Sequence, residues 1–149
     1  MFDTQDIAAL ERGKLLIQQA RCLIMEEYPV YDADDACLYL RCNAFYLDIE
    51  FDFEQPIIIF CINRAIDRPI TRNDLRRLNE LNLGNPLGQH ALHEEFQHYL
   101  YRRSHLMETP LTPEVLEEII SHCYIEALRG YGSLTAGQRG SYSPRPGRA

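Results

Sequence analysis

The stretch FYLDIEFDF, residues 45–53, decides the fold because its apolar and polar residues alternate strictly. The first set is Phe45, Leu47, Ile49, Phe51 and Phe53, and the second is Tyr46, Asp48, Glu50 and Asp52. Successive side chains of a β-strand point to opposite faces of the sheet. The alternation therefore predicts a strand with one buried face and one wet face, which is typical of an antiparallel sheet.

Two further apolar segments flank this strand. CLYLRC at 37–42 is predicted to pair with it through a tight turn near Asn43. After a turn at EQP, IIIFCINR at 57–64 predicts a third strand that is apolar on both faces. Both faces of that strand should then be covered, or one of them should be a docking surface.

Three segments have the periodicity of amphipathic helices. The first spans about 4–28 and cannot continue past Pro29. The second spans 71–83 and ends before a glycine. The third begins after Thr112, a good N-cap with proline next to it, and is expected to end at Gly130.

Two more strands, PLGQHALH at 86–93 and FQHYLYRRSHL at 96–106, are predicted around a Glu94-Glu95 turn. The predicted order is α-β-β-β-α-β-β-α. This order indicates a single α+β domain over residues 1–132, with an antiparallel sheet and helices packed chiefly on one face. Residues 133–149, SLTAGQRGSYSPRPGRA, have the composition of a disordered basic tail.

Charge and composition narrow the classes of partner. The net charge of the 149 residues is −7, and the tail holds three arginines and no acid, so residues 1–132 carry −10. An acidic body repels phosphate backbones, which argues against nucleic acid. We expect no membrane association and a cytoplasmic location, because the chain lacks both a spanning apolar run and a signal-peptide pattern. The five cysteines contain no CxxC pair and are expected to be buried thiols.

The segment HEEFQH at 93–98 is close to a zinc-protease motif. That motif places two histidines four residues apart on one helical face, whereas His93 and His98 are five apart. If the segment is a hairpin, these two histidines lie diagonally on one face and His90 faces away. Catalytic zinc needs three protein ligands, and no third one follows nearby. The sequence therefore predicts no metal site.

Other chemical motifs are also absent from the sequence. An acidic stripe of Asp48, Glu50, Asp52 and Glu54 could meet a divalent cation or a basic peptide, but a solvated sheet face explains it better. The chain contains no nucleophile elbow, phosphate loop or dinucleotide fingerprint. We therefore expect no catalytic residue, no cofactor and no enzymatic activity.

The remaining signal is a set of apolar residues expected on the outer face of the sheet. Exposed apolar patches mark partner surfaces, and tyrosine suits such surfaces because it is rigid and has a polar tip. A sheet covered by helices on both sides, or burial in a dimer, would explain the same pattern. The candidate partner-binding residues are Tyr39, Tyr46, Ile58, Phe60, Tyr99 and Tyr101. Tyr99 and Tyr101 share one face of their strand, and the alternation does not show which face that is.

The element order and two segments resemble the type III secretion chaperone fold, which YbjN-like proteins share. The segments are LNELNLGNPLGQHALHEEF at 78–96 and LYRRSHLMETPLTPEVLEEII at 100–120, within a resemblance that covers about 5–130. Two features depart from the family pattern: Glu94-Glu95-Phe96 stands where a turn glycine is usual, and the tail is rich in arginine. The resemblance implies a homodimer that holds an extended segment of another protein and performs no chemistry.

Two functions from different classes therefore follow from the sequence. The first is a non-enzymatic binding protein, a secretion-type chaperone or a YbjN-like regulator, that engages a partner polypeptide. The second is an enzyme or small-molecule binder with a pocket between sheet and helix. A deep polar pocket containing His90, His93 or His98 would favour the second function, and a shallow apolar face would favour the first.

Overall fold

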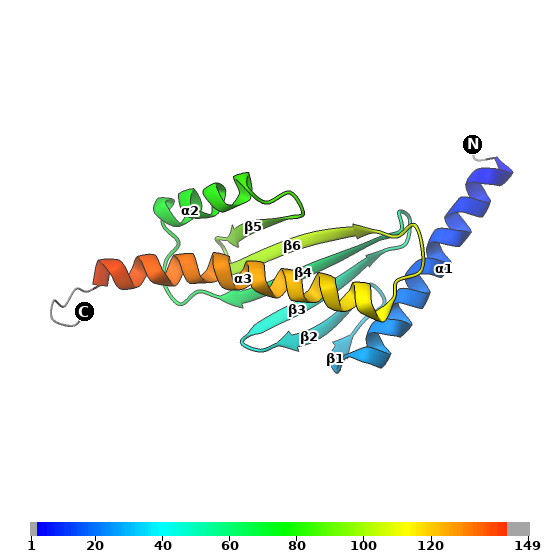
Figure 1. Ribbon diagram of the computed structural model, residues 1–149, viewed down its shortest axis with the longest axis horizontal. Coiled ribbons are helices and arrows are strands. Elements are labelled where there is room, and N and C mark those ends of the chain that lie inside the picture. The colour runs from blue at the N-terminus through cyan, green and yellow to red at the C-terminus, as the bar shows by residue number, and fades with distance from the viewer. Residues whose placement is uncertain (1–2, 143–149) are drawn as a thin grey trace.

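The computed structural model describes residues 3–142, and the side chains of residues 3–135 (Figure 1). Three helices and six strands follow each other as α-β-β-β-β-α-β-β-α in this part of the chain. Their bounds are α1 (Thr4–Glu27), β1 (Val30–Ala33), β2 (Cys37–Cys42), β3 (Phe45–Asp52), β4 (Ile57–Ala65), α2 (Arg72–Leu83), β5 (Gly88–His93), β6 (His98–Leu106) and α3 (Pro113–Tyr142).

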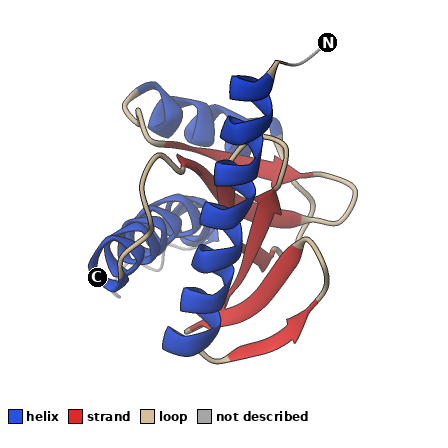
Figure 2. Ribbon diagram, turned by 90° about the vertical axis from the view of Figure 1, so that its right-hand side faces the viewer, coloured by secondary structure: helices blue, strands red, loops and turns tan. Residues whose placement is uncertain are grey.

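The six strands form one antiparallel sheet in the order β1-β2-β3-β4-β6-β5. The helices lie on one side of this sheet (Figure 2). The predicted α+β class, with an antiparallel sheet and helices chiefly on one face, is confirmed. One strand was not predicted: β1 is only four residues long, VYDA, and three of these four residues are exposed. Such a short edge strand leaves little periodicity in the sequence.

We call the side of the sheet that packs against the helices the covered face, and the opposite side the open face. The covered face holds the main core, and most of its side chains are almost completely buried. Its central residues are Leu38, Leu40, Phe45, Leu47, Ile49, Phe51, Ile58, Phe60, Ile62, Tyr99 and Tyr101. The residues of β3 therefore alternate between the two faces as the sequence predicts, and Phe45, Leu47, Ile49 and Phe51 face the core.

Helix α1 packs on the sheet through only part of its length. Gly13 lies against Pro56, and the guanidinium carbon of Arg21 is 5.6 Å from the centre of the Phe51 ring. The first turns of α1 extend beyond the sheet (Figure 1), which leaves Ile7 and Leu10 exposed although they share the apolar periodicity of the helix. An aspartate caps its start: Asp3 accepts a hydrogen bond from the amide of Asp6.

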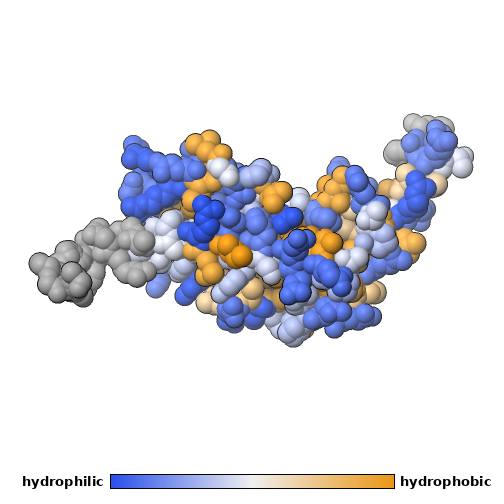
Figure 3. All heavy atoms as spheres, in the orientation of Figure 1, coloured by the Kyte–Doolittle hydropathy of each residue, from blue (hydrophilic) through white to orange (hydrophobic). Residues whose placement is uncertain are grey.

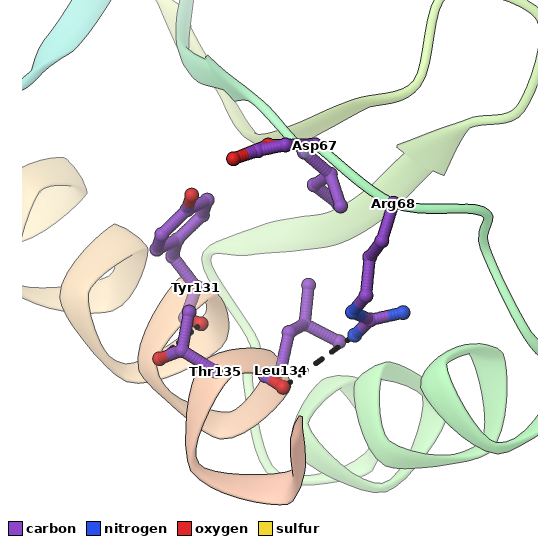
Figure 4. Close-up of a pocket in the computed structure, with 6 residues that line it drawn as sticks. Asp67, Arg68, Tyr131, Leu134 and Thr135 are labelled. Carbon is purple, nitrogen blue, oxygen red and sulfur yellow. Dashed lines mark hydrogen bonds between the residues drawn. The ribbon is translucent and has the colours of Figure 1, made fainter. Parts of the chain in front are cut away.

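Helix α3 is longer than the sequence predicted. It passes through Gly130 and continues to Tyr142, so the expected stop at Gly130 is wrong. Leu134 is buried, and its carbonyl accepts a hydrogen bond from Nη2 of Arg68 at 3.5 Å. Figure 4 shows this contact at a small pocket between the end of α3 and the segment that precedes α2.

Helix α3 extends past the predicted start of the tail. Residues 133–142 belong to α3. The rest of the predicted tail, 143–149, lies outside the described residues. Glycine and serine lowered the helical signal of this stretch. Leu134 within it is buried and contacts Arg68, which is distant in sequence.

Helix α2 begins at a capping box with a buried acid. The Thr71 hydroxyl accepts a hydrogen bond from the Asp74 amide at 3.2 Å, and the Thr71 amide donates to the Asp74 carboxylate at 2.8 Å. Arg68 adds two hydrogen bonds to the same carboxylate, at 2.7 and 2.8 Å. The Arg68 bonds, with smaller help from Thr71, lower the pKa of Asp74 from 3.8 to about 2.

We expect acid to remove this stabilisation. Because the pKa of Asp74 is lower in the folded chain, the ionised carboxylate adds about 2 kcal/mol to the free energy of unfolding above about pH 4. This contribution is lost as the pH falls through about 2. Urea denaturation at about pH 6 and about pH 2.5 should show that Asp74→Asn loses about 2 kcal/mol less between these conditions than the parent protein does. Glu80→Gln, at an exposed position of the same helix, is the control. Full acid sensitivity in Asp74→Asn would contradict the assignment.

Candidate functional site on the open face of the sheet

The open face has no helix over it in the described part of the chain (Figure 2). The cross-strand pairs show which residues share this face: Tyr39 is opposite Asp48, Asp48 is opposite Cys61, and Cys61 is opposite Arg102. Polar and apolar side chains therefore share this face. The residues that line it on the four central strands include Tyr39, Arg41, Tyr46, Asp48, Glu50, Ile57, Ile59, Cys61, Asn63, His98, Leu100, Arg102 and Leu106.

An apolar strip runs along β4 and β6 of the open face. Ile57, Ile59, Cys61 and Leu100 are half-buried, and Leu106 is exposed. The sequence left two alternatives for β4, namely that both faces are covered or that one is a docking surface. Helices cover one face of β4, and none of the helices in the described part of the chain lies over the other face.

Two of the six predicted partner-binding residues, Tyr39 and Tyr46, lie on the open face. Tyr46 is 41% exposed, and its ring centre is 6.5 Å from that of Tyr31. The guanidinium carbon of Arg41 lies 4.5 Å from the same ring centre. Tyr39 donates a hydrogen bond from its hydroxyl to Asp34 at 3.2 Å. These contacts hold the aromatic rings in place at the β1–β3 end of the face.

The outer-face position expected for Ile58 and Phe60 is wrong, and Tyr99 and Tyr101, whose face the sequence left open, lie on the same covered side. Ile58, Phe60, Tyr99 and Tyr101 are 0% exposed and belong to the covered face. The apolar residues of β4 occur on both faces, so its sequence could not show which of the two sets faces the helices. In β6 the Tyr99 hydroxyl bonds to buried His90 and the Tyr101 hydroxyl donates to half-buried Asn85, contacts that no periodicity reveals.

Two hollows open on this side of the sheet. The first, which we call the acidic hollow, has a volume of about 540 Å³ and lies where the β1–β2 and β3–β4 connections meet. The second, the apolar hollow, has a volume of about 250 Å³ and lies near the β5–β6 turn. The acidic hollow is lined by Asp34, Ala36, Cys37, Tyr39, Glu50, Phe51, Asp52, Phe53, Glu54 and Ile59. The apolar hollow is lined by Asp48, Cys61, Asn63, His93, Phe96, His98 and Leu100.

The carboxylates of the acidic hollow make no ion pair with another described residue. Asp34 is held in its ionised form, because the amide of Ala36 and then the hydroxyl of Tyr39 donate hydrogen bonds that lower its pKa. Asp52 accepts bonds from the amides of Glu54 and Gln55. The hollow therefore presents negative charge beside the aromatic and aliphatic side chains that line it.

The HEEFQH segment forms the turn between β5 and β6. His93 and His98 are direct cross-strand partners, not diagonal neighbours, and four residues rather than two separate them. Gln97 has φ 50°, the left-handed conformation that glycine often supplies in such turns. Among residues 3–142, no group of three or more His, Cys, Asp or Glu side chains is arranged to hold a metal ion.

His90 points away from the other two histidines, as predicted, into a buried polar cluster that the sequence did not reveal. Its Nδ1 is 2.7 Å from the Tyr99 hydroxyl, and its Nε2 is 3.2 Å from Glu126. Glu126 also accepts hydrogen bonds from Arg129 and Asn85. Burial lowers the pKa of His90 despite the nearby carboxylate. Both ring nitrogens are engaged, so this cluster is a core element.

Two asparagines close the β5 edge of the sheet. The amide and carbonyl of His90 bond to the side chain of Asn82, at 2.7 and 2.9 Å, as they would to a neighbouring strand. The Gly88 amide donates to Asn85 in the same way. Unpaired strand edges attract other chains. Because these side chains occupy backbone groups of β5, a partner strand cannot pair with those groups at this edge.

One negative finding concerns membranes. No helix within residues 3–142 has both the length and the apolar character needed to cross a bilayer.

Comparison with known proteins identifies the fold. No protein-family model and no curated protein matches the sequence. A chain of the HopA1–SchA chaperone–effector complex matches the structure with a TM-score of 0.54 and 19% identity, over 87% of this chain and 97% of that one. YbjN from E. coli, whose suggested role is transcription regulation, matches with a TM-score of 0.60 and 15% identity, over 83% and 91%. The resemblance to the secretion-chaperone and YbjN-like fold is thus confirmed at the level of the fold.

Proposed function

We propose that this protein is a non-enzymatic binding module, chaperone-like or regulatory, that holds a segment of a partner polypeptide on the open face. One observation carries the proposal: within residues 3–142 the six-stranded sheet has helices on one side only, and apolar side chains lie among polar ones on the other. Ile57, Ile59 and Leu100 are half-buried there, and Tyr46 is exposed. Apolar surface beside polar groups is the usual chemistry of a protein-binding site.

The fold comparison and the histidines both support this function over the runner-up. One structural neighbour belongs to a chaperone–effector complex. A pocket enzyme would be favoured by a deep polar site around the histidines. Instead, His90 is buried with both ring nitrogens engaged, and His93 and His98 line the broadly open apolar hollow.

A homodimer in the cytoplasm completes the proposal. The surface around α2 supports self-association, because Leu75, Leu83 and Leu87 are exposed, Leu83 by 82%. Figure 3 views the helical side and shows apolar areas near α2 within a mostly hydrophilic surface. Light scattering coupled to size-exclusion chromatography measures the mass directly. A particle of 17.4 kDa at all concentrations would rule out the dimer.

The test compares the two sides of the molecule. Ile59→Asp places a charge in the apolar strip of the open face, and Ile125→Asp places one on the exposed side of α3. The partner is first identified by affinity capture from the native cell and mass spectrometry, and its affinity is then measured by calorimetry. We expect Ile59→Asp to weaken binding at least about tenfold, or about 1.4 kcal/mol, and Ile125→Asp to leave it unchanged. Thermal unfolding confirms that both variants are folded. Wild-type affinity in a folded Ile59→Asp variant would reject the open face as the binding site.

A further inference from the structure

We infer that the bound segment carries an arginine or lysine that enters the acidic hollow and, a few residues away, an apolar side chain that enters the apolar hollow. This inference rests on the proposed function, because it describes the chemistry of what the open face holds.

The charge of the open face points to a cationic side chain. Glu50 is exposed on β3, and Glu54 is exposed in the turn that follows it. Neither makes an ion pair with a described residue, and no lysine or arginine lines the acidic hollow. Asp34 adds a carboxylate that its hydrogen bonds keep ionised. Arg21 supplies one positive charge near Asp34, because its Nη2 donates to the Asp34 carbonyl at 2.6 Å. Glu50 and Glu54 have no ion pair with a described residue, so a cation in this hollow would complement these two carboxylates.

The walls of the acidic hollow favour a long cationic side chain over a small ion. Tyr39, Phe53 and Ile59 line it together with the carboxylates. Arginine stacks on aromatic rings and binds carboxylates through two parallel hydrogen bonds. The methylene stem of arginine or lysine can cover apolar surface while its charged end reaches an acid. Both parts of such a side chain would therefore find partners in one hollow.

The apolar hollow calls for a different side chain. Cys61, Leu100 and Phe96 form much of its wall, and the Phe96 ring centre is 4.7 Å from that of His93. The Asp48 carboxylate, which lines this hollow, is less available for a cation. Asn63 donates a hydrogen bond to it at 3.3 Å, and burial raises the pKa of Asp48. A leucine, methionine or aromatic side chain would remove this apolar surface from water.

The positions of the two hollows on the sheet set the spacing. Glu50 and Ile59 line the acidic hollow, while Asp48 and Cys61 line the apolar one. These residues are two positions apart on β3 and on β4, which is about 7 Å along a strand. An extended segment advances about 3.3 Å per residue, so a cation and an apolar residue separated by about two to five residues can reach both hollows.

The experiment uses a library of random linear peptides of about 12 residues, displayed on phage and selected on the full-length protein. We expect arginine or lysine to be enriched over the starting library, with an apolar residue about two to five positions away. The best peptide is then synthesised, and its affinity is measured by fluorescence anisotropy at about 50 and about 300 mM NaCl. The added salt should weaken its binding.

Two double variants with equal charge change identify the hollow. Glu50→Gln with Glu54→Gln should weaken peptide binding about tenfold or more, since it removes two carboxylates of the acidic hollow. Glu114→Gln with Glu118→Gln changes two exposed carboxylates at the start of α3 and should have little effect. Replacing the selected arginine or lysine of the peptide with glutamine should reproduce the loss.

The outcomes separate this inference from the proposed function. Leu100→Asp charges the apolar strip outside the acidic hollow. If it abolishes peptide binding but basic residues are not enriched, or if the acidic-hollow variant binds normally, the inference is overturned and the proposed function stands. Equal weakening by both double variants would reveal general charge attraction and would also overturn it. If Leu100→Asp binds the selected peptides normally, the proposed function fails together with the inference. Selection of no sequence with the expected pattern is likewise a result against the inference.

Discussion

Replacing Gly130 with alanine is expected to lower the free energy of unfolding by about 3 kcal/mol or more, although alanine is the better helix former. Gly130 lies within α3, where a Cβ atom would stand 2.5 Å from Nδ1 of His90 and closer still to the Tyr99 hydroxyl. Both groups are buried and bonded to each other. The added methyl group would therefore force apart a packed polar cluster and leave buried polar atoms without partners.

Gly132 provides the control for this prediction. It lies two residues further along the same helix, and nothing stands within 4 Å of the place where its Cβ would be. Gly132→Ala should therefore raise stability by up to about 1 kcal/mol, the usual gain for this change in a helix. Urea denaturation of both variants measures the difference. If the two substitutions have the same sign, α3 does not pack against His90 and Tyr99 as described.

The second large effect concerns the tyrosines of the two sheet faces. Tyr99→Ser should destabilise the fold by about 3–5 kcal/mol, because the ring is 0% exposed and its hydroxyl bonds to His90. Tyr46→Ser should change stability by no more than about 1 kcal/mol, because the side chain is 41% exposed on the open face. Thermal and urea unfolding of both variants measure the change in stability. Partner binding is then measured for Tyr46→Ser, which is expected to be folded.

Tyr99→Phe refines the comparison. It keeps the ring in the core but removes the hydroxyl beside Nδ1 of His90, so a loss of about 1–3 kcal/mol is expected. For Tyr46→Ser the expected signature is nearly normal stability with weakened partner binding. Strong destabilisation by Tyr46→Ser would show that the β3 side opposite the core is also covered. A stable Tyr99→Ser variant would contradict the placement of β6 tyrosines in the core.

Local patterns in the sequence were sufficient for most of the fold. The alternation from Phe45 to Phe53 reports the two faces of β3, because a strand places successive residues on opposite sides. The capping box of Thr71 and Asp74 reports the start of α2, since its partners lie three residues apart. Each of these signals is carried by residues that are neighbours in the chain. The same locality explains why HEEFQH could be recognised as a hairpin segment, not a helical metal motif.

The candidate site depended on the tertiary structure to a greater extent. Both faces of β4 are apolar, so only its pairing with β3 and β6 shows that Ile58 and Phe60 face the helices while Ile59 and Cys61 line the open face. Tyr46 could be placed from β3 alone, since it shares the side of Asp48 and Glu50, and Tyr39 of β2 lies opposite Asp48. The two hollows combine residues of separate strands and turns, which no single segment of sequence brings together.

The sequence by itself thus determined the α+β class, the antiparallel pattern and an acidic body, because periodicity, capping and charge are properties of short stretches. Only the tertiary structure decided that Gly130 lies inside a helix, that His90 meets Glu126, and that Ile58 and Phe60 face the helices. The physical reason is that burial and hydrogen-bond partnership depend on residues far apart in the chain. His90 and Glu126, for example, are separated by 36 positions.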